Sequence, residues 1–244
     1  MAEINQSYIG VGKVHMRLAG TTGAFRHVGN CSVLNLKQKL DVKRQKDYTR
    51  LGGGTLKKVE RLDAVDAEIT LLSFNADNMA LATAGAATPV AGAVVTDEVV
   101  KGYKGALLRL AHPPTSVQAV TNSAGITTYV AGTDFELSPG GLWIPLTSAI
   151  VDAADLKVDY TYPAYDRIEA ATSTSKVMEV VFEGLNEAEG GSATVVDIWR
   201  MSVPAANELA LIGDNMGELK FAAELLKDTS KGGGVSAYFR VQKV

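Results

Sequence analysis

The stretch SKVMEVVFEGLN, residues 175–186, decides the class of fold that we predict for this 244-residue chain. Its residues fall into two alternating sets, as they do in a β-strand, because successive side chains of a strand point to opposite faces of a sheet. One set is Met178, Val180 and Phe182, and the other is Val177, Glu179, Val181 and Glu183. Since only the second set carries charge, the pattern predicts a strand with one buried face and one partly wet face.

Four further segments have the same β character. They are short, rich in β-branched and aromatic residues, and separated by turn-forming residues. They are AEITLLSF (67–74), ATVVDIWRMSV (193–203), ELKFAAELLKD (218–228) and VSAYFRVQ (235–242). The segment DTSKGGG (228–234) predicts a hairpin loop between the last two, because its glycines tolerate positive φ. The sequence therefore predicts a mostly-β protein.

One helix is predicted over NADNMALATAG (75–85). Asn75 is a suitable N-cap, helix-forming residues follow it, and Gly85 is a stop signal. The segment PAANELALIG (204–213) fits either a second short helix or a strand-to-loop connection.

In residues 95–168 the turn-forming residues are more closely spaced. They recur about every eight to twelve residues, which is typical of a small β-sandwich. The small-residue tract ATAGAATPVAGAVV (82–95) precedes them, and strands of the first kind resume at residue 176. We therefore predict an inserted Ig-like domain at 95–168, flanked by the two parts of a core domain at 1–94 and 169–244.

Charge is spread unevenly along the chain. Residues 37–61 contain nine basic and three acidic residues, a net charge of +6, which leaves −9 on the rest of a chain whose net charge is −3. Such asymmetry favours contact between copies through opposite patches. The segment is too long for a tight hairpin, so we predict an extended loop or arm that reaches a neighbouring subunit. The alternatives are a mobile solvated loop or a nucleic-acid arm, and Tyr48 is the only aromatic residue available in it for base stacking.

No motif predicts catalysis, a metal site or a cofactor. Gly52–Gly54 lack the spacing of a phosphate-binding loop, and the three histidines are scattered. Cys31 is the only cysteine and is expected to be a small buried apolar residue. No segment approaches the ~20 apolar residues of a membrane span, and the N-terminus lacks a signal-peptide pattern. We expect a soluble protein, synthesised in a cytoplasm, that is not an enzyme.

Three segments in this order resemble major tail tube proteins of tailed bacteriophages or prophages. They are AEITLLSFNADNMALATAG (67–85), TTYVAGTDFEL…GGLWIPLTSAIVDAADLKVDYTY (128–162) and VMEVVFEGLNEAEGGSATVVDIWRMSVPAANELALIGDNMGELKFAAELLKD (178–228). The first and third are similar to the strand–helix signature and the C-terminal half of such proteins. The second is similar to Ig-like modules of tail proteins.

The resemblance implies a β-sandwich or half-barrel core with one flanking helix, whose strands from six subunits close into a ring. Rings stack into a tube in the virion tail that conducts genomic DNA into the host, while the Ig-like domain decorates the exterior. It also implies tape measure and tail terminator proteins as partners, and only transient, non-specific passage of DNA.

Two sets of residues follow from this resemblance. A long loop between early strands of such proteins reaches an adjacent ring or subunit, and the matching residues here are Lys43, Arg44, Lys46, Tyr48, Arg50, Lys57 and Lys58. The lumen of such tubes is acidic, and the candidates on predicted strands are Glu179, Glu183, Asp197 and Glu224.

A second hypothesis is a binding module in which the Ig-like domain recognises a carbohydrate or a cell surface, motivated by Tyr129, Phe135 and Trp143. Aromatic residues of this kind also form the cores of small sandwiches. A third is a related tail cap or bacterial secretion tube.

Overall fold

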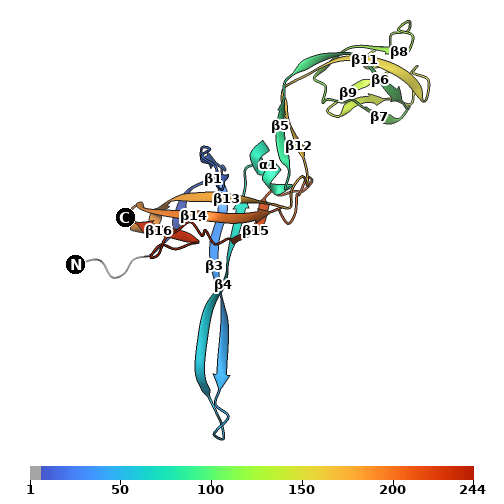
Figure 1. Ribbon diagram of the computed structural model, residues 1–244. Helices are drawn as coiled ribbons and strands as arrows, with labels where there is room; N and C mark the ends of the chain where they lie inside the picture. The colour runs from blue at the N-terminus through green and yellow to red at the C-terminus, as the bar shows by residue number, and fades with distance from the viewer. Residues whose placement is uncertain (1–6) are drawn as a thin grey trace. The chain divides into compact units, whose positions relative to one another are not determined.

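The computed structural model of the chain describes residues 7–244 (Figure 1). These residues form mostly β-strands, with one α-helix and one short 3-10 helix among them, which confirms the predicted mostly-β class. They divide into two compact units. Unit 1 comprises residues 7–87 together with Ile168–Val244, and unit 2 is Thr88–Arg167.

Unit 1 is built on one antiparallel sheet with the strand order β2-β1-β13-β14-β15-β4-β3, in which β16 also pairs with β14. Its elements are β1 (Gly10–Leu18), β2 (Arg26–His27), β3 (Cys31–Lys46), β4 (Thr55–Leu71), α1 (Ala76–Ala82), β13 (Ser175–Asn186), the 3-10 helix η1 (Glu187–Glu189), β14 (Ser192–Pro204), β15 (Leu219–Leu225) and β16 (Phe239–Lys243).

The core of unit 1 lies on one face of this sheet. Val180 and Ile198 are fully buried, and Met178 and Phe182 pack against the same cluster. The alternation read from residues 175–186 is therefore confirmed, and β13 has the predicted bounds. Gly10, Val11, Gly12 and Val14 of β1 line one pocket together with residues 31–35 of β3, so these parts of β1 and β3 lie close together although the two strands are not neighbours in the sheet.

Helix α1 begins as the sequence predicts and ends slightly earlier. The Asn75 side chain accepts a hydrogen bond from the backbone N–H of Asn78 at 2.9 Å, which caps the N-terminus. The left-handed residue at the C-terminus is Ala84, with φ of 48°, rather than the predicted stop residue Gly85. Gly85 is needed for a different reason, because a Cβ there would lie 2.2 Å from the carbonyl oxygen of Glu169.

Two local predictions are resolved by the tertiary structure. The prediction of a hairpin loop at 228–234 is wrong, because β16 pairs with β14 and not with β15. The physical reason is that β15 and β16 pair with successive segments of β14, β15 with residues 201–202 and β16 with residues 194–198, so they follow each other along β14 and do not pair side by side. Residues 205–218 contain no helix and form a loop from β14 to β15, the connection that was the alternative for 204–213.

Unit 2 is a small β-sandwich of two three-stranded sheets with the orders β7-β10-β9 and β6-β11-β8. Its strands are β6 (Ala93–Gly102), β7 (Ala106–Arg109), β8 (Ser116–Asn122), β9 (Glu136–Ser138), β10 (Gly141–Ile144) and β11 (Ala154–Tyr162). Leu142 from one sheet and Val158 from the other are fully buried in a shared core. Tyr160 belongs to this core, and burial, aided by its hydrogen bond to Glu98, raises its pKa to about 12.

The chain passes between the units in β5 (Ala86–Val90) and β12 (Tyr165–Glu169), which pair with each other. The boundary expected at residues 94 and 95 falls inside β6, because the small-residue tract that suggested a linker belongs partly to strands. The boundary expected at 168 and 169 falls within β12.

Candidate functional site

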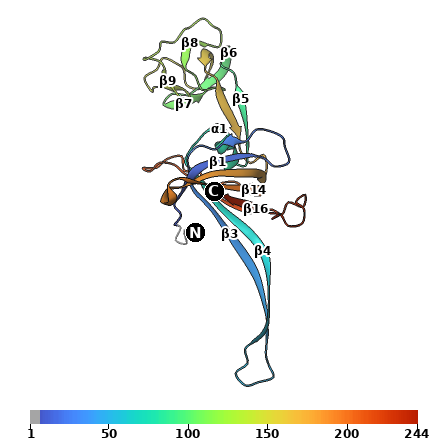
Figure 2. The same cartoon turned by 90° about the vertical axis from the view of Figure 1, so that its left-hand side faces the viewer.

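The most unusual part of unit 1 is a two-stranded arm, which we define as residues 40–62. Figures 1 and 2 show the distal halves of β3 and β4 extending away from α1 and from the rest of the sheet. The two strands pair from Cys31↔Leu71 to Lys46↔Thr55, with three irregularities in the register. Of the predicted extended loop or arm, the structure shows an arm: the segment is a long β-hairpin, and only residues 47–54 form its loop. β3 and β4 each continue from the core into the arm as a single strand, although the register shifts between Lys39 and Leu40.

The seven residues predicted to contact another subunit all lie in the distal part of this arm. Lys43, Arg44 and Lys46 are on β3, Tyr48 and Arg50 are in the loop, and Lys57 and Lys58 are on β4. Two of these lysines have acidic partners on their own strands, in the pairs Lys43–Asp41 and Lys58–Glu60. Within residues 7–244, the other four basic residues of this set, Arg44, Lys46, Arg50 and Lys57, form no ion pair, so the arm presents unpaired positive charge.

The arm also exposes apolar side chains. Tyr48 is 87% exposed and Leu51 at the tip is fully exposed. Leu40 and Leu62 face each other across the two strands, and both are exposed as well. A two-stranded hairpin without a packed face is at best marginally stable in water, and exposed apolar patches mark contact surfaces. The arm therefore has the composition of a segment that packs against another surface.

The four acidic candidates lie on the face of the sheet opposite the core. Glu179 and Glu183 alternate with the buried Val180, and Asp197 pairs in register with Val181. Glu224 alternates with the buried Ala223 and Leu225 on β15. The structure thus brings all four to one side of one sheet.

Basic partners for these acids were not anticipated from the sequence. Arg17 Nη2 lies 2.7 Å from Glu179 Oε2, His15 Nε2 lies 2.9 Å from Glu183 Oε2, and Arg240 Nη2 lies 2.7 Å from Asp197 Oδ2. The partners come from β1 and β16, far from the acids in the chain. For His15 and Arg17 the available signal is the alternation of β1, which places residues 13, 15 and 17 on one face.

The same face continues into the base of the arm with further pairs. Lys37 lies 2.5 Å from Glu68 and Lys39 lies 2.5 Å from Asp66, each across the β3–β4 ladder. The lysine partner lowers the pKa of Glu68, and Asp66 raises the pKa of Lys39. The face is therefore a mixed-charge surface and not a purely acidic one.

The described residues offer little that resembles a reaction centre. Within residues 7–244, no group of three or more His, Cys, Asp or Glu side chains is placed to hold a metal ion. Cys31 is half-buried, its Sγ–H contacts the carbonyl oxygen of Val33 at 3.2 Å, and burial raises its pKa. In the same range, no helix has the length and apolarity to cross a bilayer.

The aromatic residues behind the binding hypothesis are divided between core and surface. Phe135 is buried, and Tyr129 packs against the core of unit 2. Trp143 is 42% exposed and pairs in register with the exposed Leu107. Leu146, also exposed, is close to Gly105 at the start of β7.

Comparison with known proteins gives one family. A family model described as "Protein of unknown function UCP028589" matches residues 7–242. A search of curated proteins gives no match. Because the matched segment spans nearly the whole chain, this protein belongs to the family described as "Protein of unknown function UCP028589".

Proposed function

We propose that this chain is a non-catalytic structural subunit of a phage tail tube. In this proposal copies form rings, six to a ring as the resemblance implies, and the rings stack in the virion tail. The lumen conducts genomic DNA into the host, and tape measure and tail terminator proteins are the neighbours at the two ends.

The observation that carries the proposal is the arm. Its residues 40–46 extend about 23 Å at roughly 3.3 Å per residue, with unpaired basic residues and exposed apolar residues on a hairpin that has no core. Contact with another copy would bury Leu51 and Tyr48 and place the positive charge near the acidic remainder of a neighbouring chain. A solvated loop would need neither the long ladder nor the apolar tip.

The sheet supports the same proposal in two ways. Its end strands are β2, only two residues long, and β3, whose outer edge is unpaired along the arm. Exposed strand edges favour pairing with another chain. In addition, a mixed-charge face offers passing DNA few unpaired cations, and it is such cations that hold phosphates.

The proposal is tested by electron microscopy and sedimentation of the purified full-length protein across salt and concentration. We expect rings and tubes, whereas particles that stay monomeric under all conditions would contradict the proposal. A shortened-arm variant sharpens the test: residues 43–59 are replaced by Asn-Gly, so that the paired residues Val42 and Glu60 flank a two-residue turn. This variant should keep the monomer's circular dichroism spectrum and lose tube formation.

A second candidate is surface binding by unit 2, favoured by the exposed Trp143, Leu107 and Leu146. Glycan-array and cell-binding assays of the full-length protein, beside a Trp143→Ser variant, test it. Binding that is lost in the variant supports this function. Equal signals from both proteins, or none, count against it.

A further inference from the structure

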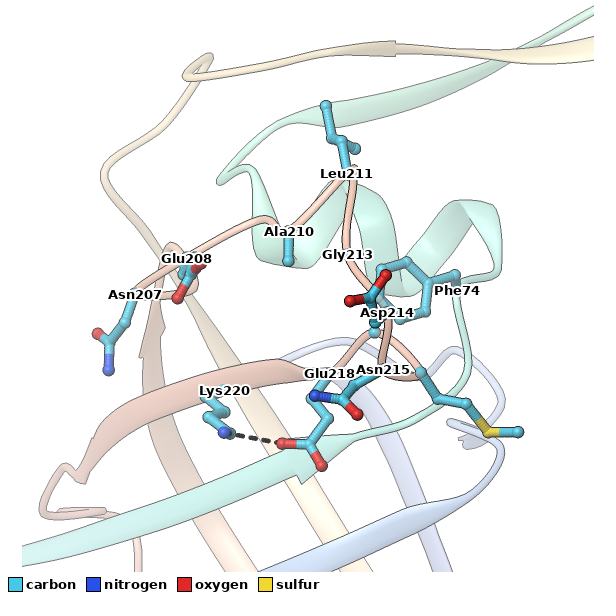
Figure 3. Close-up of a pocket in the computed structure, with 12 residues that line it drawn as sticks. Phe74, Asn207, Glu208, Ala210, Leu211, Gly213, Asp214, Asn215, Glu218 and Lys220 are labelled. Carbon is cyan, nitrogen blue, oxygen red and sulfur yellow. Dashed lines mark ion pairs between the residues drawn. The ribbon is translucent and has the colours of Figure 1, made fainter.

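The loop between β14 and β15, residues 205–218, forms a pocket at one end of unit 1 (Figure 3). Its start is anchored, because the N–H of Ala206 donates to the carbonyl oxygen of Ala82 and Leu209 packs against the core. Its distal part lines a pocket of about 860 Å³ together with Phe74. Gly217 lies against the Phe74 ring, since a Cβ at that position would be 2.6 Å from it.

At this pocket, exposed apolar side chains lie beside negative charge. Leu211 and Met216 are 78% and 96% exposed although they belong to a loop held at both ends. Three carboxylates line the pocket, from Glu208, Asp214 and Glu218, against one lysine, Lys220. Lys220 pairs with Glu218 at 2.8 Å, as the dashed line in Figure 3 marks, which raises the pKa of the lysine. Within residues 7–244, Glu208 and Asp214 have no ion-pair partner.

The tip of the arm has the complementary chemistry. It exposes Tyr48 and Leu51 beside Lys46 and Arg50, which form no ion pair within the described chain. The tip needs apolar and acidic contacts, and the pocket offers both. Opposite charges of this kind steer and orient an encounter between two surfaces.

The two surfaces lie at opposite ends of one strand. The tip precedes Thr55, the first residue of β4, whereas Leu71 at the other end of β4 pairs with Leu219, next to Glu218 of the pocket. These ends are roughly 55 Å apart at about 3.3 Å per residue over the 17 residues of β4. A chain therefore cannot place its own tip in its own pocket, so any such contact requires a second copy. Such head-to-tail contacts generate open-ended stacks.

We propose that the pocket formed by residues 205–218 and Phe74 receives the arm tip, residues 46–51, of another copy of this chain. Leu51 and Tyr48 contact Leu211 and Met216, and Lys46 and Arg50 face Glu208 and Asp214. This inference rests on the proposed self-assembly and names the surface through which it occurs.

Cross-linking between two differently tagged full-length chains tests the contact. One chain carries Leu51→Cys and the other Met216→Cys, both in a Cys31→Ser background, and a short bis-maleimide reagent is added under assembly conditions. The matched control replaces Met216→Cys by Ile126→Cys, which is 84% exposed on unit 2. We expect the mixed product to exceed that of the control pair by about tenfold, the factor that about 1.4 kcal/mol of preference gives.

The outcomes separate this inference from the proposed function. Tubes that form without the mixed product overturn the docking and leave the tube proposal intact, whereas particles that never assemble overturn both. A second experiment exchanges the charges of the two surfaces. Lys46→Glu with Arg50→Glu should reduce the mixed product by about tenfold, because it removes two attractive charge pairs and adds repulsion. Glu208→Lys with Asp214→Lys in the receiving chain should restore it. A product that does not respond to either change contradicts the assigned pairing.

Discussion

The guanidinium of Arg240 donates two hydrogen bonds to Oδ2 of Asp197, from Nε at 3.1 Å and from Nη2 at 2.7 Å. The two residues pair in register across β14 and β16, on the face of the sheet opposite the core. Arg240 also lies over the Trp199 ring, with its Cζ 5.3 Å from the ring centroid. This contact attaches the last strand to the middle of the sheet.

Arg240→Ala should loosen β16 more than it destabilises the whole fold. We expect a loss of about 1 kcal/mol, since the pair is partly exposed, and faster amide exchange confined to residues 239–243. Hydrogen exchange followed by mass spectrometry checks this. Arg240→Lys is the control, because it keeps the charge but loses the double hydrogen bond, and it should give an intermediate rate. Faster amide exchange throughout unit 1 would contradict the prediction that Arg240 acts only on β16.

Asp134 gives unit 2 a pH-dependent contribution to stability. Its carboxylate accepts hydrogen bonds from the N–H groups of Val130 and Ala149, at 2.8 and 2.9 Å, and these lower its pKa. A carboxyl whose pKa is lower in the folded state stabilises the fold above its unfolded pKa of about 3.9, and that contribution is lost as pH falls through the folded pKa. Asp134→Asn should therefore lower the melting temperature at pH 7 and differ little from wild type near pH 2. An equal difference at both pH values would contradict the argument.

Asn75→Ala should destabilise unit 1 by about 1 kcal/mol, because it removes the N-cap of α1. Asn75→Asp keeps an acceptor for the N–H of Asn78 and should be close to wild type. Chemical denaturation of the three proteins checks the ranking, and equal midpoints for the alanine and aspartate variants would be evidence against a capping role.

Gly85→Ala should destabilise the protein by about 1–3 kcal/mol, the usual cost of overpacking, because the new Cβ meets the backbone of Glu169. Gly232→Ala is the matched control, since open space surrounds that position. Thermal unfolding should separate the two variants. If both melt together, the close approach of Glu169 is not a constraint on the folded chain.

Charge reversal in the arm should weaken assembly without affecting the fold. Arg44→Glu with Lys46→Glu changes two residues without ion-pair partners and leaves Lys43, which pairs with Asp41, unchanged. We expect a several-fold rise in the concentration at which tubes form, followed by light scattering. Lys104→Glu with Lys227→Glu makes the same change of net charge elsewhere and should assemble like wild type. If the two double variants form tubes at the same concentration, the arm does not contribute to assembly through its charge.

Predictions from the sequence were most accurate where a local pattern carried the information. The alternation of residues 175–186 gave the bounds of β13, and Asn75 gave the start of α1. They failed where the outcome depended on distant partners. The turn at 228–234 has good hairpin chemistry, but β16 pairs with residues 194–198 of β14, next to the segment of β14 that pairs with β15. The basic segment was expected to be an extended loop or arm and not a hairpin, because nothing local indicates that Leu40 and Leu62 lie opposite each other in one ladder.

The sequence by itself determined β13, β14 and β15, the helix, the closely spaced turns of the inserted unit and the concentration of positive charge in one segment. Each of these depends on residues close together in the chain, whose periodicity and turn chemistry act locally. Only the tertiary structure decided that the basic segment is a coreless β-arm, that the four acids share one face with basic partners from β1 and β16, and that an acidic, apolar pocket lies at the other end of β4. These facts depend on which strands become neighbours, and that is set by the burial of the whole sheet.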